Sequence, residues 1–536
     1  MTTRLPLASS EKYSGGCKLV GVGQDDNAGA FCCCPECKAL EKKYGHPAGA
    51  YYDFLLDMSA RFGKSHPKLL ITFLAYRDEQ TLFPAKCMKK LPANLLPSFA
   101  PLMADFAKPY THAVNRKQFV NFKAWAKVAS KMQWWSYPTT YPFPITSIPL
   151  GANIRRLADN FRTAHRNKVF DAYCQFGMGP YNAFGFNDLR LYMLCELCRD
   201  ITRDEQSIVV EYTDFCHGAA APMVRKYLAE LEELDAKMKF YLRWNPDLLS
   251  IPYVTGKNLL RWERDFDTME KLVADDPRRL FNVRRVRWTL DETVIAKWPY
   301  LTPAEQKAFG DLETYIKRVS ETIDRDHEEL LSSIRESDPA RYKEVFARRR
   351  ANYYRGLDQY IARARGGKDL PKRYAKRTVY RILPNRHRGG LDADPEAAFG
   401  LCNKGAYPKQ GAWFTLRRFD AGKPGEWESF QLPKFFGAKS VSRPSGKYGL
   451  HYLGDVTLSP DSQLSFSPIS RFSSFALGHL YDPKRPRQLY SLVVSLAVDP
   501  ERKWVKLDQL LVFPTGRDAA AGASGKAGKD KVDAFF

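Results

Sequence analysis

Long apolar runs are missing from this chain of 536 residues. No apolar stretch is long enough to cross a bilayer, so we expect no membrane insertion. Residues 1–14 lack the apolar core of a secretory signal, and the sequence as written assigns no compartment. A glycine-rich phosphate loop of the P-loop or dinucleotide type is also missing. The sequence therefore predicts no organic cofactor.

The cysteine pattern does not form a disulfide framework. The chain has 11 cysteines, an odd number, and most lie outside the cluster at Cys32, Cys33, Cys34 and Cys37. This distribution mildly favours a reducing compartment. Cys32, Cys34 and Cys37 combine a C-x-x-C pair with a third thiol, a spacing that can hold zinc or a disulfide. No second pair follows at a suitable spacing, so we predict no metal site and keep zinc at these three residues as the weaker alternative.

The composition indicates a globular protein with an excess of positive charge. Hydrophobic residues make up 44% and aromatic residues 13% of the chain, which is enough for two or three domain cores. Lys and Arg total 83 against 60 acidic residues, a formal net charge of +23. Such an excess favours anionic partners, such as an acidic polysaccharide, a nucleic acid or a membrane surface.

Alternating apolar and helical segments predict an α/β fold in residues 1–240. Helical spacing is clear in residues 119–129, 154–161 and 220–238, where Pro222 suits a first-turn position. Alternation of this kind is typical of β/α units around a parallel sheet. We expect strands at residues 18–23, 69–76, 99–105, 133–137 and 168–175.

Three further regions follow the α/β region. Residues 241–377 are predicted to form a helical domain or extension, in which Thr302, Pro303 and Glu305 supply an N-cap, a first-turn proline and a capping-box acid. Residues 378–514 alternate with a period of two between turn residues, which predicts a β-sandwich module. Residues 515–536 are rich in Gly, Ala, Lys and Asp, so a disordered tail is expected.

Several motifs in a fixed order resemble those of one family, called domain of unknown function 4838. The motifs are GQDDN at residues 23–27, then Cys32, Cys34, Pro35 and Cys37, then LAY ending at Tyr76, then Trp135 and Tyr137, then Asp188, Leu189, Arg190 and Tyr192. The resemblance covers residues 17–238 and, more loosely, residues 413–513. It implies a glycoside-hydrolase-like barrel, often behind an N-terminal domain similar to that of α-glucuronidases and often followed by a β-rich module.

The chain departs from this family in two ways. The family's barrel normally begins well upstream of the first strand here, and five strands are counted where a closed (β/α)8 TIM barrel needs eight. We therefore expect either an N-terminally truncated barrel, which the family resemblance would place in a secreted or periplasmic protein, or an open half-barrel. Family members also tend to carry acidic residues on the later strands, where this chain has Ser136, Cys174 and Gln175.

The end of the first strand carries the main candidates for catalysis. Glycoside hydrolysis needs two carboxyl groups that flank the scissile bond. Asp26 matches the family's aspartate at this position, and neighbouring Asp25 would raise the proton affinity of one of the two carboxylates. Gln24 and Asn27 are expected substrate contacts. The structural alternative is that Asp26 is an N-cap or orders the loop before the helix at Pro35.

Other candidate side chains follow the later strands. Asp105 ends an apolar segment and could face a sugar, whereas Asp171 lies inside a strand and is expected to bond to a neighbour. Pyranose C–H faces stack on flat apolar rings, so the aromatic residues at strand ends are candidates for substrate binding. The substrate-binding prediction comprises Tyr76, Asp105, Trp135, Tyr137 and Gln175, together with Gln24 and Asn27. Aromatic residues that fill the barrel core are the structural alternative.

A rival function comes from the basic stretch at residues 348–388, in which tyrosines are interleaved with arginines. Such a pattern fits single-stranded nucleic acid, where arginines contact phosphates and rings stack on bases. No RNA-recognition, KH or zinc-finger signature accompanies it, so we consider nucleic acid the less favoured partner. Our main hypothesis is a glycoside-hydrolase-like protein that acts on a polysaccharide, which could contain uronic acid. The alternative is a carbohydrate-binding protein without catalysis.

Overall fold

The computed structural model divides the chain into two compact units. The first comprises Met1–Thr139, Ala152–Phe176 and Arg190–Gln206, and the second comprises Thr140–Gly151, Gly177–Leu189 and Ser207–Phe536. The structure describes residues 19–24, 31–77, 81, 83–138, 154–175, 185–238, 242, 251–370, 372, 378–386, 392–406, 413–419, 427–431, 448–460, 462–467, 473–499 and 504–519.

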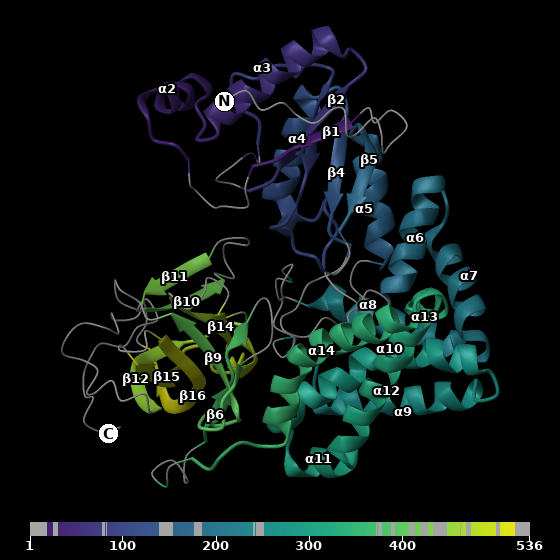
Figure 1. Ribbon diagram of the computed structural model, residues 1–536, viewed down its shortest axis with the longest axis vertical. Coiled ribbons are helices and arrows are strands. Elements are labelled where there is room, and N and C mark those ends of the chain that lie inside the picture. The colour runs from purple at the N-terminus through teal and green to yellow at the C-terminus, as the bar shows by residue number, and fades with distance from the viewer. Residues whose placement is uncertain are drawn as a thin grey trace. The chain divides into compact units, whose positions relative to one another are not determined.

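A five-stranded parallel sheet forms the centre of the first unit (Figure 1). Its strands are β1 (Leu19–Val22), β2 (Leu70–Ala75), β3 (Leu95–Phe99), β4 (Met132–Ser136) and β5 (Val169–Cys174). They lie in the sheet in the order of the sequence, and each pairs in parallel with the next. The mixed α/β prediction is confirmed in this form, as a sheet that resembles half of a barrel.

The predicted position of one of the five strands is wrong. A strand was expected at residues 99–105, whereas β3 spans Leu95–Phe99. Pro97 lies within β3 and has no N–H to donate to a neighbouring strand, so the sequence argues against a strand at this position. All five residues of β3 are buried, so burial between neighbouring strands outweighs the unfavourable residue.

Helices α4 (Arg116–Val128) and α5 (Ile154–Arg166) pack on one face of this sheet. Right-handed connections between successive parallel strands bring their helices to the same side. Ring contacts join Phe73 of β2 to Trp125 of α4, with centroids 5.4 Å apart, and Trp134 of β4 to Phe161 of α5, 5.3 Å apart. The first unit also contains α2 (Pro35–Tyr44), α3 (Gly49–Ser65) and the 3-10 turn η1 (Ala113–Asn115), which precedes α4. Helix α6 (Asn187–Arg199) spans the division between the units.

The second unit contains the predicted helical region. Its helices are α7 (Glu205–His217), α8 (Ala221–Lys237), α9 (Gly256–Leu272), α10 (Pro277–Lys297), α11 (Pro303–Phe309), α12 (Leu312–Leu330), α13 (Ser332–Ser337) and α14 (Pro339–Ala364), with 3-10 turns η2 (Gly218–Ala220) and η4 (Trp298–Tyr300). The capping box at Thr302 and Glu305 is confirmed. The structure groups α8 with the second unit, whereas the prediction placed it in the barrel region. No described helix is long and apolar enough to span a membrane.

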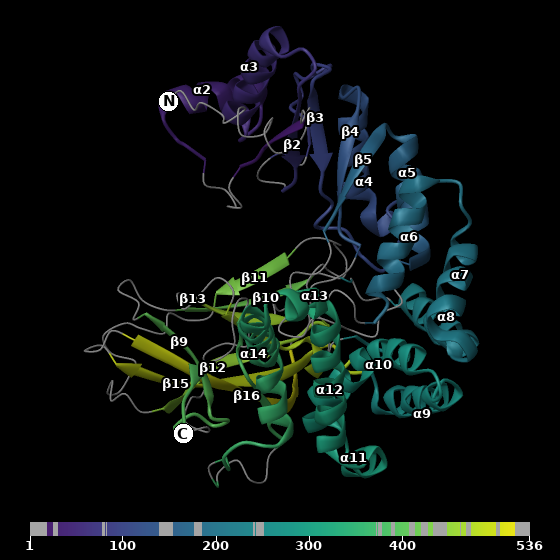
Figure 2. The ribbon, with the colours of Figure 1, turned by 45° about the vertical axis from the view of Figure 1, so that its right-hand side comes forward.

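Two antiparallel sheets complete the second unit (Figure 2). One has the order β11-β10-β13-β14-β7, and the other has the order β12-β15-β16-β9-β8 with β6 paired to β16. The strands are β6 (Tyr380–Ile382), β7 (Asn385–Arg386), β8 (Asp392–Ala393), β9 (Leu401–Ala406), β10 (Trp413–Phe419), β11 (Trp427–Gln431), β12 (Gly449–Thr457), β13 (Gln463–Ser467), β14 (Ser473–Ala476), β15 (Gln488–Asp499) and β16 (Trp504–Asp518), and a 3-10 turn, η6 (Gly478–Leu480), lies before β15.

One hydrophobic core lies between these two sheets. Phe414 of β10 and Phe466 of β13 stack with centroids 4.5 Å apart, and they belong to the same buried cluster as Leu492 of β15 and Val512 of β16. The strand β16 continues to Asp518, which pairs with Gln488. Residues 515–518, predicted to be part of the tail, are therefore strand, because pairing with β15 supplies hydrogen bonds that composition does not reveal.

Candidate functional site

The face of the parallel sheet opposite its helices carries a row of polar side chains. Paired residues on neighbouring strands share a face, so the polar residues Ser98, Gln133 and Asp171 form one row across β3 to β5, next to Leu74 on β2. Gln133 Nε2 donates to Asp171 Oδ2 at 2.5 Å, which confirms the expectation that Asp171 bonds to a neighbour. We call this side of the sheet the open face, because the helix contacts described above all lie on the other side.

Aromatic and amide groups lie one layer closer to the carboxyl ends of the strands. Trp135 on β4 is paired with Tyr173 on β5, and their ring centroids are 4.3 Å apart. The indole Nε1 of Trp135 donates to Oε1 of Gln175 at 2.8 Å, which fixes the plane of the indole ring. Tyr173 is 54% exposed and Trp135 is half-buried. We call Trp135, Tyr173 and Gln175 the aromatic platform.

The structure brings only some of the predicted site residues to this platform. Trp135 and Gln175 are in direct contact there. Gln24 lies two residues after the end of β1 and is half-buried. The Tyr51 hydroxyl of α3 donates to the Val22 carbonyl at 2.8 Å at the end of that strand. The predicted catalytic pair Asp25 and Asp26, and the predicted contact Asn27, lie outside the described residues.

Two other predicted residues belong to the loops that follow β2 and β4. The backbone N–H of Tyr76 donates to the Thr81 hydroxyl at 3.3 Å, and its ring lies beside the Arg77 guanidinium. Tyr137 lies just beyond the end of β4, where its ring contacts Phe106 with centroids 6.1 Å apart. Both rings therefore lie next to strand ends.

Asp105 organises the loop that follows β3. The side chain is buried, and its Oδ1 accepts the backbone N–H of Ala107 at 2.8 Å. Asn115 Oδ1 accepts the backbone N–H of Asp105 at 2.7 Å, and the Asn115 amide donates to the Pro109 carbonyl at 3.0 Å. Buried polar groups satisfied by backbone in this way stabilise a loop conformation. The contacts of Asp105 are those of a loop-ordering residue.

Sequence reasoning missed Tyr173 as a site residue. The signal was available, because alternation along β5 places Tyr173 on the same side as Asp171 and Gln175. Its exposure could not be read from the sequence, since the same pattern would describe a ring that fills the core of a closed barrel.

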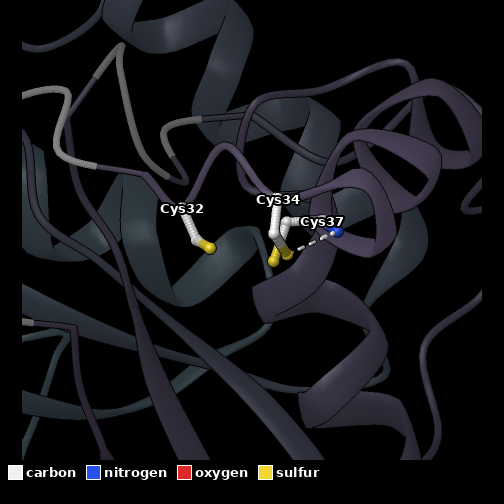
Figure 3. A group of neighbouring side chains, drawn as sticks. All are labelled: Cys32, Cys34 and Cys37. Atoms are coloured by element: carbon white, nitrogen blue, oxygen red, sulfur yellow. Dashed lines mark hydrogen bonds between the residues drawn. The ribbon is translucent and has the colours of Figure 1, made fainter.

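Three thiols converge at the start of α2 (Figure 3). The Sγ atoms of Cys32, Cys34 and Cys37 all lie within 4.8 Å of one another, and none forms a disulfide. Cys34 is the N-cap of the helix, and its Sγ accepts the backbone N–H of Cys37 at 3.5 Å. Pro35 at the first helical position has no N–H to leave unpaired, so this sequence favours a helix start here. Cys33 is exposed, and its thiol donates to the Phe31 carbonyl at 3.6 Å.

Hydrogen bonds within this thiol cluster shift the pKa values of two thiols in opposite directions. A backbone hydrogen bond from Cys34 lowers the pKa of Cys32, with further hydrogen bonds from the Cys34 and Cys37 side chains. A side-chain hydrogen bond with Cys34 raises the pKa of Cys37 to about 12. Donors stabilise a thiolate, and a thiol that donates keeps its proton more firmly.

The basic stretch at residues 348–388 packs partly into the second unit. Arg363 and Tyr360 of α14 are buried, and the Arg363 guanidinium lies 5.3 Å from the ring centroids of both Tyr360 and Tyr300. Tyr380 on β6 is half-buried and packs against the core between the antiparallel sheets. These described rings serve packing, because single-stranded nucleic acid needs rings whose faces are open to bases.

A buried charge network lies in the second unit and was also missed. Arg285 of α10 pairs with Asp188 at 2.8 Å and with Asp326 of α12 at 3.4 Å. Burial raises the pKa of Asp188, and it raises the pKa of Asp326 to about 6. Both partners of Arg285 lie far from it in the sequence, so spacing along the chain could not reveal the network.

Comparison with protein families identifies the part of the chain that contains the open face and the thiol cluster. The family model described as Domain of unknown function (DUF4838) matches residues 12–229. This match confirms the resemblance to that family predicted from the motifs, and residues 12–229 are called the DUF4838 segment below. The DUF4838 segment spans all five parallel strands and ends within α8. No similar sequence is found among curated proteins.

Proposed function

We propose that the DUF4838 segment is a glycoside-hydrolase-like unit that binds polysaccharide on the open face of its parallel sheet. The aromatic platform of Trp135, Tyr173 and Gln175 is the observation that carries this proposal. Sites in barrel enzymes lie at the carboxyl ends of the strands, and the platform lies at those ends of β4 and β5.

The chemistry of the platform suits a sugar ring. A pyranose has C–H faces that pack on an aromatic ring and hydroxyls that need donors and acceptors at its rim. The exposed Tyr173 ring offers such a surface, and the Gln133 amide and Asp171 carboxylate lie in the next row. Asp171 can accept a sugar hydroxyl through an oxygen not used by Gln133. Aromatic and polar groups therefore lie together, as an oligosaccharide requires.

The net charge supports an acidic polymer as the ligand. The formal charge of +23 raises the local concentration of polyanions around the protein, which favours a uronic-acid-containing polysaccharide over a neutral one. We also propose that the parallel sheet derives from a (β/α)8 barrel and that the two antiparallel sheets form a β-sandwich module. Their common core supports the second of these assignments.

Matched variants on β5 test the binding proposal. Tyr173 is 54% exposed on the open face, and Phe170, which is 51% exposed, lies at the register shift near the start of the same strand. We expect Tyr173→Ala to weaken binding of the best ligand by about tenfold, equivalent to about 1.4 kcal/mol, with Phe170→Ala unchanged. Titration of the full chain with neutral and uronate-containing oligosaccharides measures both variants.

Two results would contradict the proposal. In one, Tyr173→Ala and Phe170→Ala bind the oligosaccharide equally well. In the other, no oligosaccharide binds and single-stranded nucleic acid binds with an affinity that falls steeply with salt, as phosphate contacts require. That second result would establish the nucleic-acid alternative.

Hydrolysis is the further step of this proposal. The sequence supplies Asp26 as the principal carboxylate, with Asp25 beside it. We expect Asp26→Asn to abolish the release of new reducing ends from a cleaved polysaccharide while binding at the platform is retained. Full activity of Asp26→Asn would remove Asp26 from the mechanism. Binding without any cleavage by the wild-type chain would instead establish the carbohydrate-binding alternative.

A further inference from the structure

The thiol cluster of Cys32, Cys34 and Cys37 has a geometry that a disulfide does not require. A disulfide joins two sulfur atoms about 2 Å apart and has no place for a third. Here three sulfur atoms lie within 4.8 Å of one another and point toward a common centre (Figure 3). A redox-active C-x-x-C pair would account for Cys34 and Cys37, but it would not account for the Cys32 sulfur atom that lies near them.

The distances suit a tetrahedral metal ion. Zinc binds cysteine thiolates at about 2.3 Å, so two thiolates on one ion lie about 3.8 Å apart. Sulfur atoms within 4.8 Å reach this separation through side-chain adjustments of about 1 Å. Two of the three ligands lie outside the helix or at its cap, where side chains can turn without disturbing helical hydrogen bonds.

The electrostatic surroundings favour thiolates at this position. Three thiolates around a divalent ion carry a net negative charge, and the N-terminus of α2 offers backbone N–H groups and a partial positive charge. The backbone N–H of Cys37 already donates to Cys34 Sγ. Helix amides that donate to metal-bound sulfur fix the ligand and hold it deprotonated.

We propose that Cys32, Cys34 and Cys37 bind one zinc ion, with the fourth position of the tetrahedron taken by a solvent molecule or an exogenous ligand. The ion would tie residues 32–34 to the first turn of α2. The zinc proposal stands independently of the polysaccharide proposal, because its evidence lies wholly in the thiol cluster.

Cobalt and zinc titrations of the reduced full chain test this site. Cobalt(II) bound by several thiolates in a tetrahedral site shows intense sulfur-to-cobalt charge-transfer absorption, and excess zinc should displace it with a stoichiometry of one ion per chain. Zinc binding should also release thiol protons, which can be measured as a fall in pH in weakly buffered solution. These readouts require no enzymatic activity.

Serine variants identify the ligands. We expect Cys32→Ser and Cys37→Ser each to lower zinc affinity by at least about 100-fold, because loss of even an outer partner of a metal ligand costs about 10–100-fold. Cys33→Ser is the matched control and should bind zinc as wild type, since its thiol lies on the Phe31 carbonyl. Should Cys37→Ser fail to fold, Cys32→Ser carries the test, because Cys32 precedes the helix and is exposed.

Three results would overturn the zinc proposal. The reduced wild-type chain could take up neither cobalt nor zinc, or Cys33→Ser could lose as much affinity as Cys32→Ser. The wild-type chain could also hold a Cys34–Cys37 disulfide that, once reduced, shows no charge-transfer band with cobalt. The last result would assign the cluster to thiol–disulfide exchange.

Discussion

Polar groups have opposite surroundings in the charged core around α10 and on the open face of the parallel sheet. Arg287 on α10 is only 3% exposed, and its guanidinium pairs with Asp267 at 2.7 Å and Glu270 at 2.9 Å. On the open face, the Tyr173 ring is 54% exposed and Asp171 is exposed. The Arg287 guanidinium has carboxylate partners within the protein, whereas the Tyr173 ring and the Asp171 carboxylate keep surface turned outward.

This difference separates the needs of folding from those of binding. A buried charge is costly unless it is paired, so the contacts of Arg287 with Asp267 and Glu270 are sufficiently explained by folding. Folding does not require an aromatic ring to be half exposed beside an ordered amide. The groove lined by Arg284, Arg287, Arg318 and Arg325 is therefore a weaker ligand candidate than the aromatic platform, because carboxylates already occupy these arginines.

The largest expected effect comes from breaking the buried network. We expect Arg287→Ala to lower the free energy of unfolding by about 3–5 kcal/mol, because Glu270 and the buried Asp291 each lose one of their two guanidinium partners. Arg284→Ala is the matched control on the same helix. Arg284 is 45% exposed and also pairs with Glu270, so its loss should cost about 0–1 kcal/mol. Thermal or urea unfolding of both variants measures the difference, and equal losses would contradict the assignment of Arg287 to the core.

A second prediction uses the pH dependence of the same region. Burial raises the pKa of Asp326 from 3.8 to about 6, so between these values the folded chain binds more protons than the unfolded chain. The contribution of Asp326 to the free energy of unfolding therefore falls as the pH rises from about 4 to about 6. Asparagine does not titrate, so we expect Asp326→Asn to gain about 1–3 kcal/mol relative to wild type across this range.

Urea unfolding of both chains at several pH values measures this relative gain. Asp324→Asn removes a carboxylate from the same helix, α12, and controls for the change in net charge. A constant difference between Asp326→Asn and wild type from pH 4 to pH 6 would show that Asp326 is not held in the buried environment described here.

The smallest predicted effect concerns Gln175 of the aromatic platform. Gln175→Ala removes the acceptor for the Trp135 indole N–H, and we expect oligosaccharide affinity to fall about 3–10-fold, equivalent to about 0.7–1.4 kcal/mol. Gln175→Glu keeps an acceptor oxygen and should restore the affinity. The unfolding free energy should barely change in either variant, because the hydrogen bond is only partly buried. Wild-type affinity in Gln175→Ala would show that the orientation of the indole does not matter.

Periodicity located most elements of the fold before the structure was known. The helix predicted at residues 220–238 is α8, Ala221–Lys237, because its apolar stripe and Pro222 both favour a helix. Strand β10 lies within residues 378–514, where the period of two predicted strands. The short strands β7, β8 and β14 were missed, since two to four residues carry too little periodic signal. Their pairing partners, which are distant in sequence, decide that they are strands.

The sequence alone predicted which residues alternate along the strands and where several helices begin. It placed Trp135 and Gln175 near strand ends and identified the thiols of Cys32, Cys34 and Cys37 as a group. Tertiary structure decided that Trp135 and Gln175 touch while Asp105 turns into a loop, because residues on different strands meet only through sheet register. It also decided that three thiols converge at one helix start. Local pattern fixes the direction of a side chain, but only packing of distant segments fixes what that side chain meets.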